Sequence, residues 1–224
     1  MALQAPGGGA SPARLRLPQA AVIGFDLDLT LVDTRPATAL ALRRVNEGLG
    51  LAIDADAVAA RIGPPLRELL SPWVPARLLR PAAELFLAAF LELGEGSAAP
   101  MPGAAALMDA VRSAGGRCSV ITSRRDSTAT ACLRWSGLRA DSLDCRLSGP
   151  GKADAMRARA VAAYVGDHPL DVAGALAAGV PAVGVTTGAH SAAELLAAGA
   201  DFVAPSLHAL RPLLTPLPSG PAEG

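Results

Sequence analysis

The sequence predicts an α/β protein with a Rossmann-like parallel sheet covered by helices on both faces, and a small all-α cap inserted after the first strand. Three observations favour this fold. The apolar run at residues 21–25 is typical of a strand that is buried on both faces. From residue 101 onward, short apolar runs alternate with helical segments, which is the order expected of a parallel sheet with right-handed crossovers. Residues 34–100 show helical periodicity and no convincing strand.

Length and composition limit the classes of protein to consider. The chain has 224 residues, enough for one large domain or for a core with a modest insertion. Twenty basic residues balance twenty acidic ones, so charge gives no reason to expect nucleic acid or an anionic membrane as a partner. No apolar run reaches the length of a membrane span, and the three cysteines favour free thiols in a reducing compartment. We therefore expect a cytoplasmic protein, monomeric or homodimeric, with no membrane or nucleic-acid partner.

The two ends of the chain have compositions typical of disorder. Residues 1–19 are rich in Pro, Gly and Ala and lack the apolar segment of a signal peptide. Residues 212–224 hold four prolines and two glycines. The predicted organisation is a disordered tail over 1–19, a core domain over 20–33 and 101–211, a helical cap over 34–100, and a flexible tail over 212–224.

Helices make up the predicted cap. A helix over 36–50 begins with a proline, which suits a first turn, and ends with a glycine, which suits a helix stop. Asp54 can cap a second helix that runs to about Ile62. The Gly-Pro-Pro at 63–65 forces a turn, which either breaks a helix or presents a specificity loop. The remaining predicted helices are short pieces at 66–70 and 75–80 and a longer helix that opens at Pro81.

Strands and helices alternate in the predicted core. Ser191 and Glu194 form a capping box, and Asp126 is a candidate helix cap. The predicted strands after the first one cover residues 117–122, 143–147, 161–165, 181–185 and 202–203. The predicted helices cover residues 104–114, 126–137, 152–159, 169–178 and 191–198.

Polar side chains follow the predicted strands at their carboxyl ends, where sites form in such sheets. In chain order they are Asp26, Asp28, Thr122, Ser123, Lys152, Asp167 and Asp171. Two neighbouring carboxylates repel each other unless a cation lies between them, and Mg²⁺ is a hard cation that prefers oxygen ligands. Lys152 is the only lysine of the chain, which indicates a need for a compact ammonium group there unless its position is a matter of chance.

These motifs resemble those of the haloacid dehalogenase (HAD) superfamily, in the phosphoglycolate-phosphatase-like branch whose helical cap follows the first motif. The matching residues are Asp26-Leu27-Asp28-Leu29-Thr30, Thr122, Lys152 and Gly166-Asp167-His168-Pro169-Leu170-Asp171. The resemblance covers about residues 20–209. It implies a Mg²⁺-dependent phosphatase that hydrolyses a small phosphorylated metabolite, phosphoglycolate-like or a sugar phosphate, through an aspartyl-phosphate intermediate.

The resemblance also implies a role for each residue of the reaction. Asp26 is the expected nucleophile, and Asp28 is the expected general acid and base. The residues expected to hold the phosphoryl oxygens are Thr122, Ser123 and Lys152.

The expected Mg²⁺ site uses the same edge of the sheet. Its ligands would be the carboxylates of Asp26 and Asp167 and the backbone carbonyl of Asp28. Asp171 would belong to the same metal site without binding the ion directly.

Two other functions stay open within this fold: a sugar-phosphate mutase, or a catalytically silent relative that binds a phospholigand or a protein. The predicted cap contains no lysine, which disfavours phosphonate cleavage of the kind that uses a cap lysine. Asp28 is present, whereas the dehalogenating members lack this second aspartate.

The sequence departs from the family pattern at two places. Leu29 stands where most relatives have glycine, so the turn must accommodate a side chain or adopt another φ. The interval from Lys152 to Gly166 is short and leaves room for only about two turns of helix.

Overall fold

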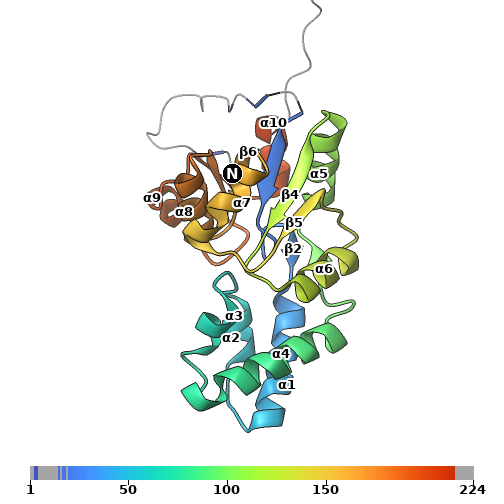
Figure 1. Ribbon diagram of the computed structural model, residues 1–224, viewed down its shortest axis with the longest axis vertical. Helices are drawn as coiled ribbons and strands as arrows, with labels where there is room; N and C mark the ends of the chain where they lie inside the picture. Colours follow the sequence, from blue (N-terminus) through green and yellow to red (C-terminus); the bar gives the residue numbers. More distant parts are fainter. Residues whose placement is uncertain (1–2, 5–14, 16, 19, 215–224) are drawn as a thin grey trace, which may run out of the picture.

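The computed structural model describes residues 3–4, 15, 17–18 and 20–214, and a six-stranded sheet forms its centre (Figure 1). The strand order is β5-β4-β1-β6-β7-β8, and every neighbouring pair is parallel. The strands are β1 (Val22–Phe25), β4 (Arg117–Ile121), β5 (Ser142–Asp144), β6 (Val161–Gly166), β7 (Ala182–Val185) and β8 (Phe202–Ala204). The predicted α/β fold with a parallel sheet is confirmed.

Helices cover both faces of this sheet, and Figure 1 shows α5 and α6 on one side and α7, α8 and α9 on the other. Alternate residues of β6 serve the two layers, because Tyr164 packs in one apolar cluster and Ala163 and Val165 pack in the other. Burial on both faces explains the nearly continuous apolar runs in the strands. The elements are α5 (Ala104–Ser113), α6 (Asp126–Trp135), the 3₁₀ helix η2 (Gly149–Lys152), α7 (Ala153–Ala158), α8 (Pro169–Ala178), α9 (Ala192–Ala197) and α10 (Leu207–Leu214).

A group of helices lies at one end of the sheet, in the lower half of Figure 1. It comprises α1 (Arg35–Leu49), α2 (Ala55–Ala59), α3 (Leu66–Leu70), the 3₁₀ helix η1 (Ala76–Leu78) and α4 (Leu79–Leu93). The chain enters the group through β2 (Val32–Asp33) and leaves it through β3 (Ala99–Pro100), and these two strands pair antiparallel. The sequence did not predict this pair, because two residues are too few to show a pattern. The division of the chain into a core and a cap domain stays a prediction.

Most helix ends agree with the local signals. The side chain of Asp54 accepts a hydrogen bond from the backbone N–H of Ala57 at 3.0 Å, and Ser191 and Glu194 form the predicted capping box. The expectation that Asp126 caps α6 is wrong, because Arg125 is the N-cap and Asp126 is the first helical residue. At that position its carboxylate still interacts favourably with the positive end of the helix dipole.

Other elements also differ from the prediction. The second helix ends at Ala59 instead of Ile62. The strand predicted at 143–147 covers only residues 142–144, because the chain turns through Arg146, whose φ is 63°. Helix α10 was not predicted, and it runs through Pro212 into the predicted flexible tail, where its leucines complete the apolar core. The remaining residues of that tail, 215–224, lie outside the described part.

The predicted N-terminal tail lies largely outside the described residues too. Within it, Gln4 forms an antiparallel bridge with Val203 on β8, with N···O distances of 2.8 Å in both directions. This residue of the expected disordered tail is therefore paired. The three cysteines are free, and in the described part of the chain no helix is both long and apolar enough to cross a membrane.

Candidate active site

Asp26 directly follows β1, and its carboxylate lies against the ammonium group of Lys152. Lys152 Nζ is 2.7 Å from Asp26 Oδ1, 2.7 Å from Asp171 Oδ1 and 2.8 Å from the hydroxyl of Tyr164. Tyr164 in turn donates to the carbonyl of Ile121 at 2.7 Å, so the phenol holds the lysine from β6. All of these side chains are buried. The only lysine of the chain thus lies between two aspartates that are far from it in sequence.

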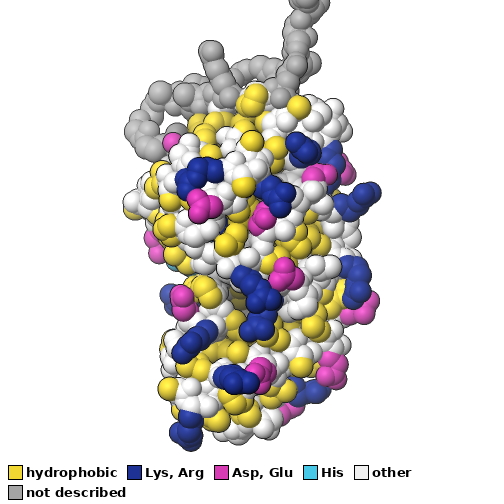
Figure 2. Space-filling model, in the orientation of Figure 1, with side chains coloured by type: hydrophobic (Ala, Val, Ile, Leu, Met, Phe, Trp, Pro, Cys, Tyr) yellow, Lys and Arg dark blue, Asp and Glu magenta, His cyan; other side chains and the backbone are white. Residues whose placement is uncertain are grey.

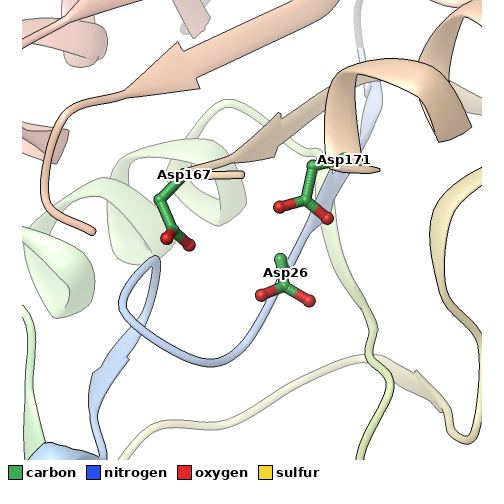
Figure 3. A group of neighbouring side chains, drawn as sticks. All are labelled: Asp26, Asp167 and Asp171. Atoms are coloured by element: carbon green, nitrogen blue, oxygen red, sulfur yellow. The ribbon is translucent and has the colours of Figure 1, made fainter. Parts of the chain in front are cut away.

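Asp167 completes a group of three acids with Asp26 and Asp171 (Figure 3). One carboxylate oxygen from each lies within 4.8 Å of the others. Asp167 Oδ1 accepts a hydrogen bond from the hydroxyl of Thr30 at 2.7 Å, whereas its Oδ2 is buried without a hydrogen-bond partner among the described residues. A Cβ on Gly188 would lie 1.9 Å from that Oδ2, so only glycine leaves this side of the carboxylate open. A buried carboxylate oxygen without a partner is costly, which fits a cation as the missing neighbour.

The raised pKa values of the acids also favour a cation at this position. Burial raises the pKa of Asp26 to about 7, although the ammonium group of Lys152 opposes the shift. Burial and the charges of Asp171 and Asp26 hold the pKa of Asp167 well above its usual value. Burial by itself would lower the pKa of Lys152, but the carboxylates of Asp171 and Asp26 raise it well above the usual range. The ammonium group of Lys152 can neutralise only one of three ionised carboxylates, so the others need protons or a second cation, and their oxygens are the donors that a divalent cation prefers.

The carboxylate of Asp28 is bound by residues outside this cluster. The guanidinium of Arg124 contacts both of its oxygens, with Nε 2.8 Å from each, and the hydroxyl of Thr34 donates to Oδ1. Arg124 also lies 4.3 Å above the ring of Phe90, which belongs to α4. The side chain of Asp28 is therefore held at the junction of the sheet and the helical group.

Thr122 and Ser123 follow β4, as predicted. Thr122 is buried, and its Oγ1 accepts a hydrogen bond from the backbone N–H of Arg124 at 3.2 Å. The hydroxyl of Ser123 donates to the carbonyl of Gly63 at 3.2 Å. Gly63 belongs to the Gly-Pro-Pro turn, which therefore lies against the strand end that carries the predicted phosphate-binding residues.

Leu29 lies in the loop between Asp28 and β2 with a φ of 55°. Its side chain is fully buried, its N–H donates to the carbonyl of Val32, and its carbonyl accepts from the hydroxyl of Thr187 at 2.6 Å. The turn thus keeps the left-handed backbone that glycine would adopt and carries a leucine there at an energetic cost.

Sequence reasoning missed several contributors to this site. Tyr164 gave no signal, because a tyrosine in a buried strand looks like a core residue. Arg124 and Arg125 directly follow Thr122, so the sequence leaves open whether they contact an anionic substrate or face solvent at a helix start, and it does not indicate the pairing of Arg124 with Asp28. Phe90 and Gly188 act on the site through their spatial neighbours, and their positions along the chain do not reveal the contacts with Arg124 and Asp167.

Comparison with known proteins identifies the family of this chain. A family model described as haloacid dehalogenase-like hydrolase matches residues 23–141, and one described as HAD-hydrolase-like matches residues 151–210. The plasmid phosphoglycolate phosphatase of Cupriavidus necator is 31% identical over 231 residues, which cover 94% of this chain and 99% of that protein.

Solved structures share the fold. A haloacid dehalogenase-like family protein of Streptococcus pneumoniae superposes with a TM-score of 0.75 at 21% identity, over 85% of this chain and 96% of the other. A predicted phosphoglycolate phosphatase from Haemophilus somnus gives 0.73 at 18% identity, over 87% and 97%. The chain therefore belongs to the haloacid dehalogenase-like hydrolase family, in its phosphoglycolate-phosphatase-like branch, and is a hydrolase of the phosphatase kind.

Proposed function

We propose that this chain is a Mg²⁺-dependent phosphatase that hydrolyses a small phosphate monoester through an aspartyl-phosphate on Asp26. The observation that carries the proposal is the buried contact of Asp26 with Lys152, in a cluster with two further aspartates at the end of β1. The relative from Cupriavidus necator is a phosphoglycolate phosphatase, so phosphoglycolate is the first substrate to test, followed by sugar phosphates.

Asp26 and Asp28 would divide the reaction into two steps. First, a carboxylate oxygen of Asp26 attacks phosphorus, the bond from phosphorus to the alcohol oxygen breaks, and Asp28 gives that oxygen a proton. Second, a water molecule attacks the phosphorus, Asp28 takes the proton of the water, and the bond to Asp26 breaks to release inorganic phosphate. Arg124 holds both oxygens of Asp28 in this structure, so one of them must leave the guanidinium when Asp28 carries a proton.

Donors around Asp26 would hold the phosphoryl oxygens, where negative charge develops. We assign this task to the hydroxyl of Thr122, to the backbone N–H groups near Ser123 and to Lys152. Fixed donors in a buried site stabilise such charge without reorganisation, which is why they contribute strongly to rate. Tyr164 keeps Lys152 oriented from β6.

Mg²⁺ would be held by the carboxylates of Asp26 and Asp167 and the backbone carbonyl of Asp28, with Asp171 close behind. The unpartnered oxygen of Asp167 supports this assignment. When bound, the ion neutralises charge between the nucleophile and the phosphoryl oxygens.

We also propose that residues 34–100 act as a cap domain. The contacts of Ser123 with Gly63 and of Arg124 with Phe90 bring this segment against the catalytic loops. A cap in that position would exclude water from the site and take part in choosing the substrate.

The test is hydrolysis of para-nitrophenyl phosphate and phosphoglycolate by the purified protein with Mg²⁺, with EDTA, and in the Asp26→Asn variant. We expect turnover that needs the metal and that falls by at least about a thousandfold in Asp26→Asn, because the nucleophile is gone. Absence of turnover in folded protein, with acetyl phosphate included as a reactive donor, would contradict the proposal and favour a binding protein of the same fold.

A further inference from the structure

A cavity of about 310 Å³ opens beside the side chain of Asp28, between the helical group and the start of α6. One wall comes from the turn that contains Pro64 and Pro65 and from α3 and α4, and the other comes from residues 123–128. Figure 2 shows a hollow at mid-height of the molecule with dark blue side chains around it. If Asp28 protonates the leaving oxygen, the alcohol part of the substrate extends into this cavity.

The inner surface of the cavity is mostly apolar. Ile62, Leu69, Phe86 and Leu87 line it, and Ile62 and Phe86 are buried in the fold. A volume of this size is at the lower end of the roughly 300–1,000 Å³ of typical small-molecule sites. A two-carbon acid such as glycolate would leave most of the apolar wall without a contact.

Cations stand at the edge of the same cavity. Arg67 on α3 and Arg125 before α6 are exposed, and neither side chain has an ion-pair or hydrogen-bond partner among the residues that the structure describes. Arg146 also lines the cavity and pairs with Asp126 at 3.1 Å. Positive groups gathered at the entrance favour a ligand that carries a negative charge beyond its phosphate.

An unpartnered hydroxyl lies on the cavity wall as well. Thr38 on α1 is 1% exposed, and its Oγ1 has no hydrogen-bond partner within the described part of the chain. Such a group costs free energy in a buried place unless a ligand or water satisfies it. Thr38 is thus a second observation, independent of the arginines, that indicates a ligand in this cavity.

We propose that the preferred substrate is a phosphate monoester whose alcohol combines an apolar body of about the size of a benzene ring with a second anionic group. This inference rests on the proposed function and narrows its substrate class. The phosphate lies at Asp26, the apolar body fills the cavity past Asp28, and the anion lies near Arg67 and Arg125. Thr38 contacts a polar atom of the alcohol part.

Four alkyl phosphates separate the two features. They are 4-carboxybenzyl phosphate, benzyl phosphate, phosphoglycolate and ethyl phosphate, which supply the ring with the carboxylate, the ring alone, the carboxylate alone and neither. In all four esters the leaving oxygen is bonded to a saturated carbon, so their intrinsic reactivities are similar. We expect kcat/KM for 4-carboxybenzyl phosphate to exceed that for phosphoglycolate by at least about tenfold, from burial of the ring. A preference for phosphoglycolate over both benzyl esters would overturn the proposal.

Variants at the arginines test the anion site. In Arg67→Gln and in Arg125→Gln, we expect the ratio of kcat/KM between 4-carboxybenzyl and benzyl phosphate to fall up to about fivefold, the effect of one exposed ion pair. Arg77→Gln on η1 and Arg134→Gln on α6 are matched controls, because these exposed arginines do not line the cavity. Equal ratios in all five proteins, the unmutated one included, would contradict the assignment of the anion to this edge.

Thr38→Val separates binding from folding. Since the hydroxyl lacks a partner, its removal should raise the Tm of the ligand-free protein by about 2–4 °C. The non-hydrolysable analogue 4-carboxybenzyl phosphonate should raise the Tm of this variant measurably less than it raises the Tm of the unmutated protein. A fall in the Tm of the ligand-free variant, or an unchanged shift with the analogue, would remove Thr38 from the site.

These outcomes are distinct from failure of the proposed function. If acetyl phosphate is hydrolysed with Mg²⁺ while the four esters show no preference for the ring or the carboxylate, only the substrate class is wrong. If no phosphate compound is hydrolysed, the proposed function itself fails. In that case binding of the phosphonate still reports on the cavity.

Discussion

Asp26 and Asp167 keep protons in the metal-free protein at pH values at which an exposed aspartate has lost them. Burial raises the pKa of Asp26 from 3.8 to about 7, and it raises the pKa of Asp167 well above 3.8. Between the pKa of an exposed aspartate and the raised pKa values of Asp26 and Asp167, the folded state binds more protons than the unfolded state. The stability of the folded state therefore falls as the pH rises through this range. A divalent cation would take the place of these protons.

We therefore predict that the Tm of the EDTA-treated protein falls from about pH 5 to about pH 7.5, and that MgCl₂ raises the Tm more at the higher pH. Differential scanning fluorimetry across this range checks both slopes. Asp154→Asn is the control for a general charge effect, because the Asp154 side chain is exposed and pairs with Arg157 instead of with the cluster. A rise in Tm with MgCl₂ that is equal at both pH values would contradict the assignment of the cation to these acids.

The left-handed backbone at Leu29 reverses the usual order of two substitutions. Leu29→Ala and Leu29→Gly both remove a fully buried side chain, but only glycine also removes the penalty of a φ of 55°. We predict that Leu29→Gly is more stable than Leu29→Ala by about 1 kcal/mol in urea unfolding. At Leu31, which is equally buried and has no positive φ, the alanine variant should be the more stable one. The same order at both positions would show that Leu29 carries no strain.

At the scale of elements, helices α4 and α6 meet through Phe90. Its ring packs 5.6 Å from that of Trp135 on α6 and lies under the guanidinium of Arg124, which holds Asp28. The orientation of the proposed general acid thus depends on a residue of the helical group. Burial by itself would lower the pKa of Arg124, but the negative charge of Asp28 outweighs this effect and raises the pKa above its usual value. The arginine stays charged.

A double-mutant cycle measures this link. We predict that Phe90→Leu and Arg124→Met couple by about 0.5–2 kcal/mol in the free energy of unfolding, the range of a cation–π contact with partial to full desolvation. The cycle of Phe86→Leu with Arg124→Met is the control, since Phe86 contacts the ring of Phe90 instead of the guanidinium. Equal coupling in the two cycles would indicate general loosening of α4.

At the scale of the whole molecule, the inserted helices begin and end at neighbouring points. Asp33 pairs with Ala99 across the β2–β3 pair, so the two ends of the insertion are already adjacent. One apolar cluster nevertheless runs from the sheet into α1 and α4, through residues such as Phe25, Leu42 and Phe90. The helical group is therefore both separable in topology and continuous in packing.

Excision of this group tests the proposed domain division. Replacement of residues 34–98 by Asn-Gly would close a two-residue hairpin between Asp33 and Ala99. We predict a chain that still unfolds cooperatively in urea, at a lower midpoint because apolar surface of the sheet is exposed. Circular dichroism follows the transition, and full-length Asp28→Asn is the control for loss of the site without loss of the helices. A transition without cooperativity would mean that residues 20–214 form one folding unit.

Local patterns in the sequence determined the α/β class, the ends of most strands and the acids that follow them. A buried strand has to be apolar on both faces, and parallel strands bring their carboxyl ends to one edge, so the positions of Asp26, Thr122, Lys152 and Asp167 along the chain predicted that they lie at the same edge of the sheet. Glycine and proline also marked most helix ends in advance. The two-residue strands and α10 were missed because they are too short or too close to a proline to show a pattern.

Only the tertiary structure decided how those groups are held. The pairing of Lys152 with Asp171 and Tyr164, the hold of Arg124 on Asp28, and the open side of Asp167 next to Gly188 join residues that are separated in the sequence. The cavity beside Asp28 has walls from both the helical group and the core. Spacing along a chain carries information about contacts within a helix or strand, whereas these contacts arise from the packing of several elements. The sequence by itself therefore determined the kind of chemistry, and the packing decided the shape of the space in which a substrate would bind.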